Sequence, residues 1–224
     1  MNEKPILFSI EMVKEILAGR KMKTRRVVKH QPPLNNSFVH GRVISSTEPK
    51  NEGCVGWGSN EGCITHYCKM PYDVGDVLWV RETWRPKGAW SGSCRGCEIE
   101  YRAGGENEII HGEVMAVPSR KTPWKPSILM PRAFARLFLK VKGIRVERLQ
   151  DITEEDARNE GCFLPSHSVE DGTLIGDSVT MFKIIWNNLN AKRGFGWDVN
   201  PWVWVVEFEK MEAEKDVQSN MQSV

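Results

Sequence analysis

Residues 136–149 alternate between apolar and polar side chains, and this pattern limits the fold more than any other feature of the chain. The run 136–142 alternates cleanly, and residues 144–149 do the same after Gly143. Successive side chains of a strand point to opposite faces of a sheet, so this alternation is typical of a strand with one buried face. We therefore expect two strands here, joined by a kink or turn at Gly143.

Other short segments have the composition of strands. Residues 77–83 are mostly apolar without clean alternation, which predicts a strand that is buried on both faces. Residues 202–208 predict a closing strand, and weaker candidates lie at 5–8, 39–45 and 98–102.

Three helices are expected between these strands. The first covers residues 9–18, begins with a serine suited to the N-cap, and is followed by a C′ glycine at Gly19. The second begins at Thr153, where Thr-x-x-Asp resembles a capping box, and ends at Gly161. The third covers residues 179–189, with apolar side chains at helical spacing. Several short strands and a few helices predict an α+β fold with a mostly antiparallel barrel.

The length of 224 residues suits a single domain with insertions, which we place over residues 1–211. One insertion, at about 31–70, is rich in Pro, Asn, Ser, Gly and Cys, and we expect a long loop there. A second irregular insertion is expected at about 85–125. Residues 212–224 form a polar tail that we expect to fray.

Composition indicates a soluble, intracellular protein. The hydrophobic content of 40% is ordinary for a chain that buries a core. No apolar run approaches the roughly 20 residues of a membrane helix, and the first residues do not resemble a signal peptide.

The net charge of only +2 does not by itself indicate a nucleic-acid binder, but the basic residues are clustered. Residues 14–29 carry seven Lys or Arg against one Glu, and residues 114–146 carry eight without any acid. The two stretches predict an electropositive face for phosphates. The alternative is that both are solvated surface.

Residues 19–26 read Gly-Arg-Lys-Met-Lys-Thr-Arg-Arg and match Gly-x-Lys-x-x-Thr-x-Arg, the signature of the ASCH (activating-signal-cointegrator homology) domain. Three further elements resemble the family in the same order: Gly75-Asp76 with the strand after it, residues 152–161, and the final Trp-Val-x-x-Phe strand. The fuller pattern is similar to larger ASCH proteins of bacteriophages and prophages. The resemblance leaves out residues 31–70, much of 85–123 and the tail.

This resemblance implies a PUA-like barrel with a cleft, a role in nucleobase or RNA chemistry, and a place in the bacterial cytoplasm. Small bacterial members hydrolyse N4-acetylcytidine with a Lys, a Thr and a Glu, which correspond here to Lys21, Thr24 and Glu160. This chain is about twice as long as those enzymes, as the resemblance implies. It also has Met22 where a Thr is often found.

The chemistry of these residues fits amide hydrolysis. A Thr hydroxyl is inert until a neighbour takes its proton, and a Lys can do so when burial or nearby cations lower its pKa. We assign Lys21 as base, Thr24 as nucleophile and Glu160 as proton relay, with Arg26 and Arg25 binding phosphate or substrate. No cofactor is required. The expected partner is a nucleoside or a nucleic acid, RNA rather than DNA, and the sequence indicates no protein partner.

Three alternatives stay open. The same residues can be phosphate-binding cations with a structural Thr and Glu. They can also belong to a non-catalytic reader of a modified or flipped base, in which Trp197 is the best candidate for stacking among nine tryptophans. A ribonuclease would need only a base and cations, which Lys21 and Arg26 would supply.

Six cysteines are too few and too unevenly spaced for a disulfide framework. Some of them instead suggest a structural zinc site that pins the two insertions, with four of five ligands completing a tetrahedron. The alternative is reduced, free cysteines in loops. The five candidate ligands are Cys63, His66, Cys68, Cys94 and Cys97.

Overall fold

The computed structural model describes residues 2–33, 38–89, 96–105, 108–111, 123–163 and 177–211. The chain forms two compact units. Unit 1 takes the described residues of Met1–Gly19, Gly75–Lys140 and Glu209–Val224, and unit 2 takes those of Arg20–Val74 and Val141–Phe208.

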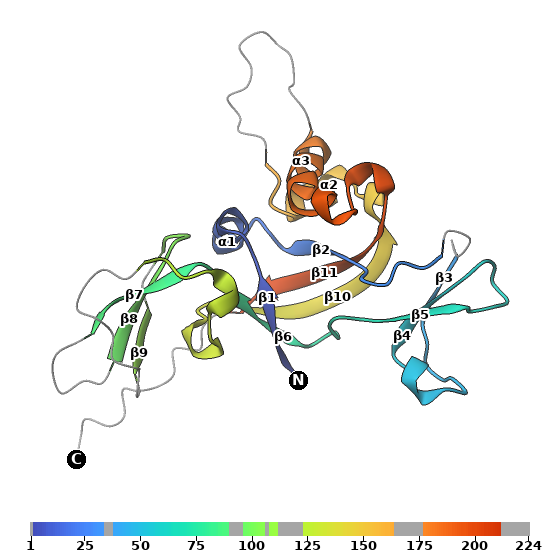
Figure 1. The fold of residues 1–224 in the computed structure, drawn as a ribbon, viewed down its shortest axis with the longest axis horizontal. Helices are drawn as coiled ribbons and strands as arrows, with labels where there is room; N and C mark the ends of the chain where they lie inside the picture. Colours follow the sequence, from blue (N-terminus) through green and yellow to red (C-terminus); the bar gives the residue numbers. More distant parts are fainter. Residues whose placement is uncertain are drawn as a thin grey trace, which may run out of the picture. The chain divides into compact units, whose positions relative to one another are not determined.

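The sheet of unit 1 contains β1 (Glu3–Leu7), β6 (Val77–Arg81) and the start of β10 (Phe138–Arg148) (Figure 1). β1 pairs with β6 in parallel, and β10 pairs with β6 antiparallel. The first four residues of β6 are buried, which confirms the expected two-sided burial. Helix α1 (Ile10–Leu17) follows β1 and confirms the first predicted helix.

Both ends of α1 follow from its sequence. The Ser9 hydroxyl accepts a hydrogen bond from Met12 N at the N-cap. Gly19 has φ 71°, a left-handed conformation that glycine adopts without steric cost.

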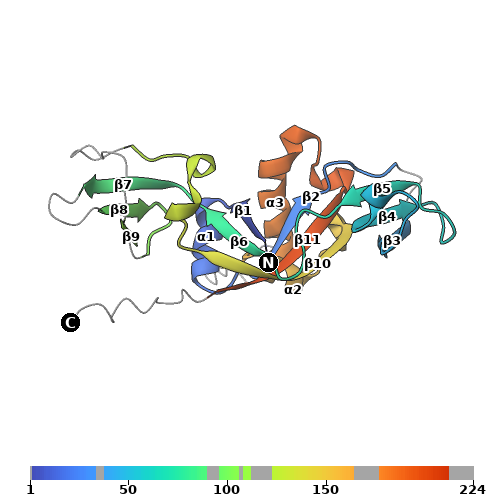
Figure 2. The same cartoon turned by 90° about the horizontal axis from the view of Figure 1, so that it is seen from below.

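A second sheet of unit 1 contains β7 (Trp84–Ala89), β8 (Gly96–Tyr101) and β9 (Glu108–His111), as Figure 2 shows. Part of the insertion expected to be irregular is therefore a sheet. The pattern is hard to see in the sequence because the register shifts between Pro86 and Gly88.

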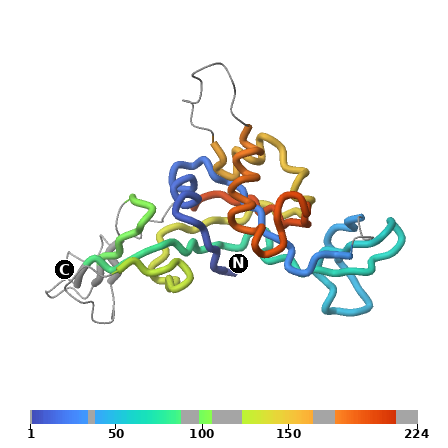
Figure 3. Tube along the Cα trace, turned by 45° about the horizontal axis from the view of Figure 1, so that its top comes forward, coloured from blue at the N-terminus to red at the C-terminus, as the bar shows by residue number. Residues whose placement is uncertain are grey.

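In unit 2, β10 pairs with β11 (Trp202–Lys210), which pairs antiparallel with β2 (Lys23–Val27). The chain trace in Figure 3 places the blue segment of β2 beside the red segment of β11. Of the kink or turn expected at Gly143, the turn is not found, because β10 is one strand of 11 residues. A Cβ at this position would lie 3.2 Å from Glu207 Oε2, so the glycine makes room for Glu207.

Residues 31–70, expected to form a long loop, contain a third sheet in unit 2: β3 (Phe38–Arg42), β4 (Cys54–Gly58) and β5 (His66–Lys69). β4 is buried along its whole length and therefore lacks alternation. Gly58 is required there, because a Cβ would lie 1.9 Å from the Cys63 carbonyl oxygen. The sheet packs on β11 through the cluster Val28, Val55, Trp57, Cys68, Trp202 and Trp204.

Helices α2 (Glu154–Asn159) and α3 (Ser178–Asn190) complete unit 2 and confirm the other two predicted helices. Phe182 and Trp186 of α3 are buried, whereas Leu189, expected on the same apolar stripe, is exposed. The helices share a core with β11, formed by Leu149, Ile152, Ala157, Cys162, Phe182, Trp186, Val203 and Val205. Single 3₁₀ turns lie at Pro49–Asn51, Ser127–Leu129, Arg132–Phe134, Leu149–Asp151, Ala191–Arg193 and Trp197–Val199.

The fold is α+β with mostly antiparallel sheets, as expected. The expected barrel is not seen, because the described strands form open sheets. Among the described helices, none has the length and apolar composition needed to cross a membrane. The tail at 212–224 lies outside the described residues.

Candidate active site

Helix α2 ends in a way that fixes Glu160. The Cys162 N–H bonds the Ala157 carbonyl at 3.1 Å, and the Gly161 N–H bonds that of Arg158 at 2.8 Å. With Gly161 at φ 84°, this is the Schellman motif. Glu160 is therefore the C-cap residue, and its carbonyl group lies at a helix end, where carbonyls need partners from outside the helix.

The edge of β2 supplies such a partner. Phe208 N donates to Met22 O at 2.9 Å and Val28 N donates to Trp202 O at 3.0 Å, so backbone groups of even-numbered residues at the two ends of β2 bond toward β11. The carbonyl of Lys23 then points away from β11, toward the edge of the described sheet. The end of α2 meets this edge, where Met22 N donates to Asn159 O at 2.8 Å.

Lys21 joins the helix end to the strand edge. Its ammonium donates to Glu160 Oε2 at 2.7 Å, to the Glu160 carbonyl at 2.8 Å and to the Lys23 carbonyl at 2.9 Å. Both side chains are buried. Three acceptors satisfy the three protons of an ammonium group, so the Lys21–Glu160 pair is a charge-assisted contact with its hydrogen bonds completed.

The second oxygen of Glu160 contacts Arg25. Arg25 Nη1 lies 3.3 Å from Glu160 Oε1, Nη2 lies 2.7 Å from Asp156 Oδ2, and Nε lies 3.0 Å from Glu147 Oε1. The Arg25 side chain has no exposed surface. A buried guanidinium with three carboxylate partners holds all of them in fixed positions.

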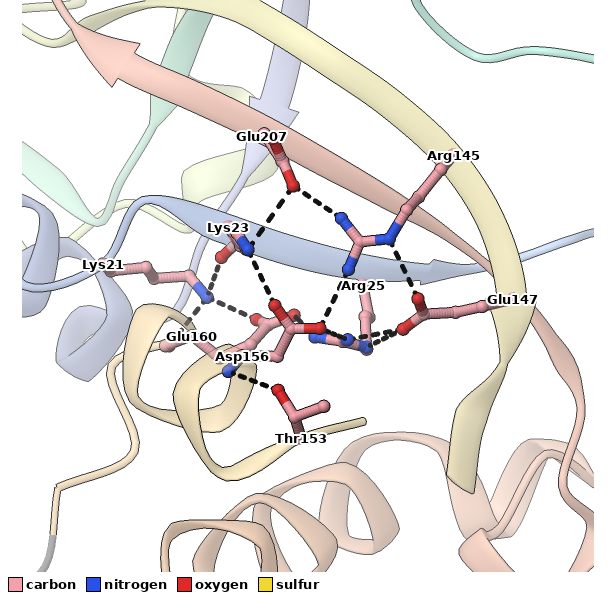
Figure 4. Close-up of polar contacts among 9 residues, drawn as sticks. All are labelled: Lys21, Lys23, Arg25, Arg145, Glu147, Thr153, Asp156, Glu160 and Glu207. Atoms are coloured by element: carbon pink, nitrogen blue, oxygen red, sulfur yellow. Dashed lines mark hydrogen bonds and ion pairs between the residues drawn. The ribbon is translucent and has the colours of Figure 1, made fainter. Parts of the chain in front are cut away.

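Asp156 extends these contacts outward (Figure 4). It also accepts from Lys23 Nζ at 2.7 Å and from Arg145 Nη2 at 2.8 Å, while Glu207 pairs with Lys23 at 3.4 Å. We call the whole set the charge network; its cations are Lys21, Lys23, Arg25 and Arg145, and its carboxylates are Glu147, Asp156, Glu160 and Glu207. Four positive and four negative charges leave it neutral.

Burial and charge act differently on the groups of the network. Burial lowers the pKa of Lys21 below its usual range, and the attraction of Glu160 opposes this only in part. Burial would raise the pKa of Asp156, but the hydrogen bonds and charges of Lys23 and Arg25 outweigh it and leave that pKa lowered. The buried amine therefore loses its proton more readily than an ordinary lysine.

Thr24 lies beside the pair but faces another way. It is buried in β2 between Lys23 and Arg25, whose side chains both reach Asp156. Strand alternation places the Thr24 side chain on the opposite face. The structure thus brings Lys21 and Glu160 into contact. The Thr24 side chain lies on the opposite face of β2 from Lys23 and Arg25.

The predicted substrate-binding residues differ in their surroundings. Arg26 shares the face of Thr24 by alternation, and its pKa is lowered by burial, although Tyr72 and Glu160 act to raise it. Arg25 lies inside the charge network, so a phosphate would compete there with three carboxylates. Trp197 packs edge-on against Phe182, with ring centroids 6.4 Å apart, in the core shared by α3 and β11.

Sequence reasoning missed the carboxylates that surround Arg25. Asp156 was visible only as the last residue of a capping box, and Thr153 Oγ1 does accept from its backbone N–H at 3.1 Å. Its carboxylate bonds Lys23 and Arg25 instead of returning to the Thr153 backbone. Glu147 and Glu207 lie on separate strands, and the sequence carries no signal for their meeting.

Many described members of the two basic stretches pair with acids, which neutralises part of their charge within the chain. In unit 1, Arg136 forms a buried pair with Glu82 at 2.9 Å, and Arg132 bonds Glu3 at 2.6 Å. Arg120 and Lys121 lie outside the described residues. The cations of these stretches with carboxylate partners include Lys14, Lys21, Lys23, Arg25, Arg132, Arg136 and Arg145.

The expected zinc site is only partly described. Cys68 Sγ donates to the His30 carbonyl at 3.0 Å and lies 3.4 Å from His66 Nε2. Burial raises the pKa of Cys68 to about 11, whereas zinc binds the thiolate. In the described part of the chain, no three His, Cys, Asp or Glu side chains form a group suited to a metal. Cys94 and the side chain of Cys97 lie outside it, so the zinc site stays a prediction.

No protein-family model, no curated protein and no solved structure matches this chain.

Proposed function

We propose that this chain is an ASCH-type hydrolase that removes the acyl group from an N4-acylated cytosine such as N4-acetylcytidine, as a nucleoside or in RNA. The observation that carries the proposal is the contact between Lys21 and Glu160. These residues are 139 positions apart in sequence, and their side chains meet at 2.7 Å in a buried site. The family resemblance implies both of them, Lys21 in the signature and Glu160 in the later helix.

The buried pair suits proton transfer. Passing one proton along the 2.7 Å hydrogen bond from Lys21 to Glu160 turns two buried charges into a neutral amine and a neutral acid. Burial favours the neutral forms, and the lowered pKa of Lys21 acts in the same direction. Arg25 Nη1 bonds the other oxygen of Glu160 and holds this side chain in place beside the Lys21 amine.

The proposed reaction proceeds in two steps. The Lys21 amine takes the Thr24 proton as Oγ1 bonds to the acyl carbon, and the C–N4 bond then breaks as N4 receives that proton. Water next attacks the acyl-threonine with Lys21 again as base, releasing the carboxylic acid and restoring Thr24. Cytosine N4 is a good leaving group because its lone pair delocalises into the ring.

The proposed reaction requires the Lys21 amine to reach Thr24 around the edge of β2. The amine is bonded at this edge to the carbonyl of Lys23, the residue that precedes Thr24. Arg26, on the face of Thr24, would bind a phosphate of the substrate or polarise the acyl oxygen. If Thr24 is not the nucleophile, Lys21 would activate water directly.

The test is incubation of the purified protein with N4-acetylcytidine and a panel of other modified nucleosides, followed by chromatography. We expect cytidine and acetate from N4-acetylcytidine, with turnover by Thr24→Ala reduced about 10²-fold or more and restored in part by Thr24→Ser. Full turnover by Thr24→Ala would exclude the covalent step and leave direct attack by water.

The second candidate is a reader that binds the modified base without reaction. The three satisfied protons of the Lys21 ammonium favour it, because this arrangement also suits a permanently charged lysine. If the protein binds a compound of the panel but turns over none of them, the non-catalytic reader is the correct function.

A further inference from the structure

Two large apolar side chains are exposed next to the Lys21–Glu160 pair. Met22 directly follows Lys21 and is 47% exposed, and Phe163 follows Glu160 by three residues and is 42% exposed. The segments that carry them are joined by the hydrogen bond from Met22 N to Asn159 O. Exposed aromatic surface costs free energy in water, and beside a polar site it is a common mark of a ligand surface.

Arg20 connects the same two segments. Its guanidinium carbon lies 5.6 Å from the centre of the Phe163 ring, within the range of a cation–π contact. The exposed face of the Phe163 ring suits stacking of a planar heteroaromatic ligand. The neighbouring Arg20 guanidinium suits the carbonyl or phosphate oxygens of such a ligand.

The burial pattern places Lys21 between two exposed side chains. Arg20 and Met22 are exposed while Lys21 between them is buried, and the bond from Phe208 N to Met22 O continues the ladder of β2 beyond its first residue. Regular alternation ends at Met22, however, because its N–H donates to Asn159 O at 2.8 Å while its carbonyl bonds toward β11.

We infer that Phe163, flanked by Arg20 and Met22, is the platform on which the pyrimidine ring of the substrate stacks. The inference rests on the proposed function and adds the residues that hold the base. It replaces Trp197, whose ring packs on Phe182 in the core. The occupant is a nucleobase, because a pyrimidine stacked on this ring would lie beside the two segments that carry Lys21 and Glu160.

The test compares Phe163→Leu with the parent protein, using N4-acetylcytidine as the probe. We expect KM to rise roughly ten-fold while kcat changes little, because leucine keeps the apolar bulk but removes the stacking face. Phe163→Tyr should keep a KM close to the parent value. Phe38→Leu is the matched control, since Phe38 is a 38% exposed phenylalanine of β3 in the same unit, and its KM should not change.

Equilibrium dialysis with the same compound separates this inference from the proposed function. If the parent binds without turnover and Phe163→Leu weakens binding, the platform stands and the hydrolase fails. If the parent turns over and Phe163→Leu keeps the parent KM, the hydrolase stands and the platform is wrong. A parent that neither binds nor hydrolyses the compound overturns both.

Discussion

Lys21 is held as a buried ion whose every proton has an acceptor. Taking an ammonium and a carboxylate out of water is costly, and the cost is offset only when geometry and hydrogen bonding are nearly complete. Lys21 meets this condition through one carboxylate and two backbone carbonyls. The arrangement has a consequence for mutation, because removing one partner leaves the other charge buried without its counter-ion.

Glu160→Gln should therefore destabilise the protein strongly. It leaves the Lys21 ammonium and the Arg25 guanidinium facing a neutral amide, and we expect the free energy of unfolding to fall by about 3–5 kcal/mol, as for other broken buried pairs. Urea denaturation measures the change. The control is Glu11→Gln, which breaks an exposed pair with Lys14 and should change the free energy by less than about 0.5 kcal/mol. Equal effects of the two substitutions would show that the buried pair does not stabilise the fold.

At the scale of elements, the end of α2 and the edge of β2 together create the site. The sequence predicts where α2 begins and ends, because Thr153 and Gly161 are recognisable as caps. It does not predict that the helix end meets β2, since this contact joins segments far apart in the chain. Alternation similarly located β10, but it could not tell whether Gly143 makes a turn or makes room for Glu207.

Gly161→Ala tests the role of the helix end. An alanine at φ 84° should cost about 1 kcal/mol of stability and shift Glu160 away from Lys21, which lowers turnover of N4-acetylcytidine. Gly194→Ala is the matched control, because Gly194 has φ 81° after another helical turn and an added Cβ there meets no atom within 4 Å. Thermal unfolding should show a similar loss for both variants, with turnover reduced only in Gly161→Ala. An equal loss of turnover in both variants would show that activity does not depend on the position of Glu160.

At the scale of the whole molecule, the sequence predicted the long periodic elements and missed the assembly. α1, α3, β6 and β11 follow from caps and apolar patterns. The two three-stranded sheets were missed because their strands contain glycines, register shifts and fully buried runs that hide alternation. The Lys21–Glu160 pair followed from a resemblance, whereas the rest of the charge network depends on strand pairing that no local pattern encodes.

The charge network should also set the acid limit of stability. The folded-state pKa of Asp156 is lowered from 3.8, so below that pH the unfolded state binds more protons and acidification favours unfolding. The contribution of Asp156 is present above pH 3.8 and is lost as the pH falls through its lowered pKa. Unfolding free energies measured between pH 2 and 6 should fall more steeply below about pH 4 for the parent than for Asp156→Asn. If the two proteins lose unfolding free energy in parallel as the pH falls, Asp156 is not the cause of the acid limit.

The most direct test of the central claim is the rate at which Lys21→Met hydrolyses N4-acetylcytidine, compared with the parent. Methionine keeps much of the side-chain shape and removes the proton acceptor, so we predict a fall of at least about 10²-fold. Lys14→Met, at an exposed lysine of α1, should keep the parent rate, and circular dichroism should show that both variants are folded. A folded Lys21→Met protein that hydrolyses the compound at the parent rate would contradict the assignment of Lys21 as the base.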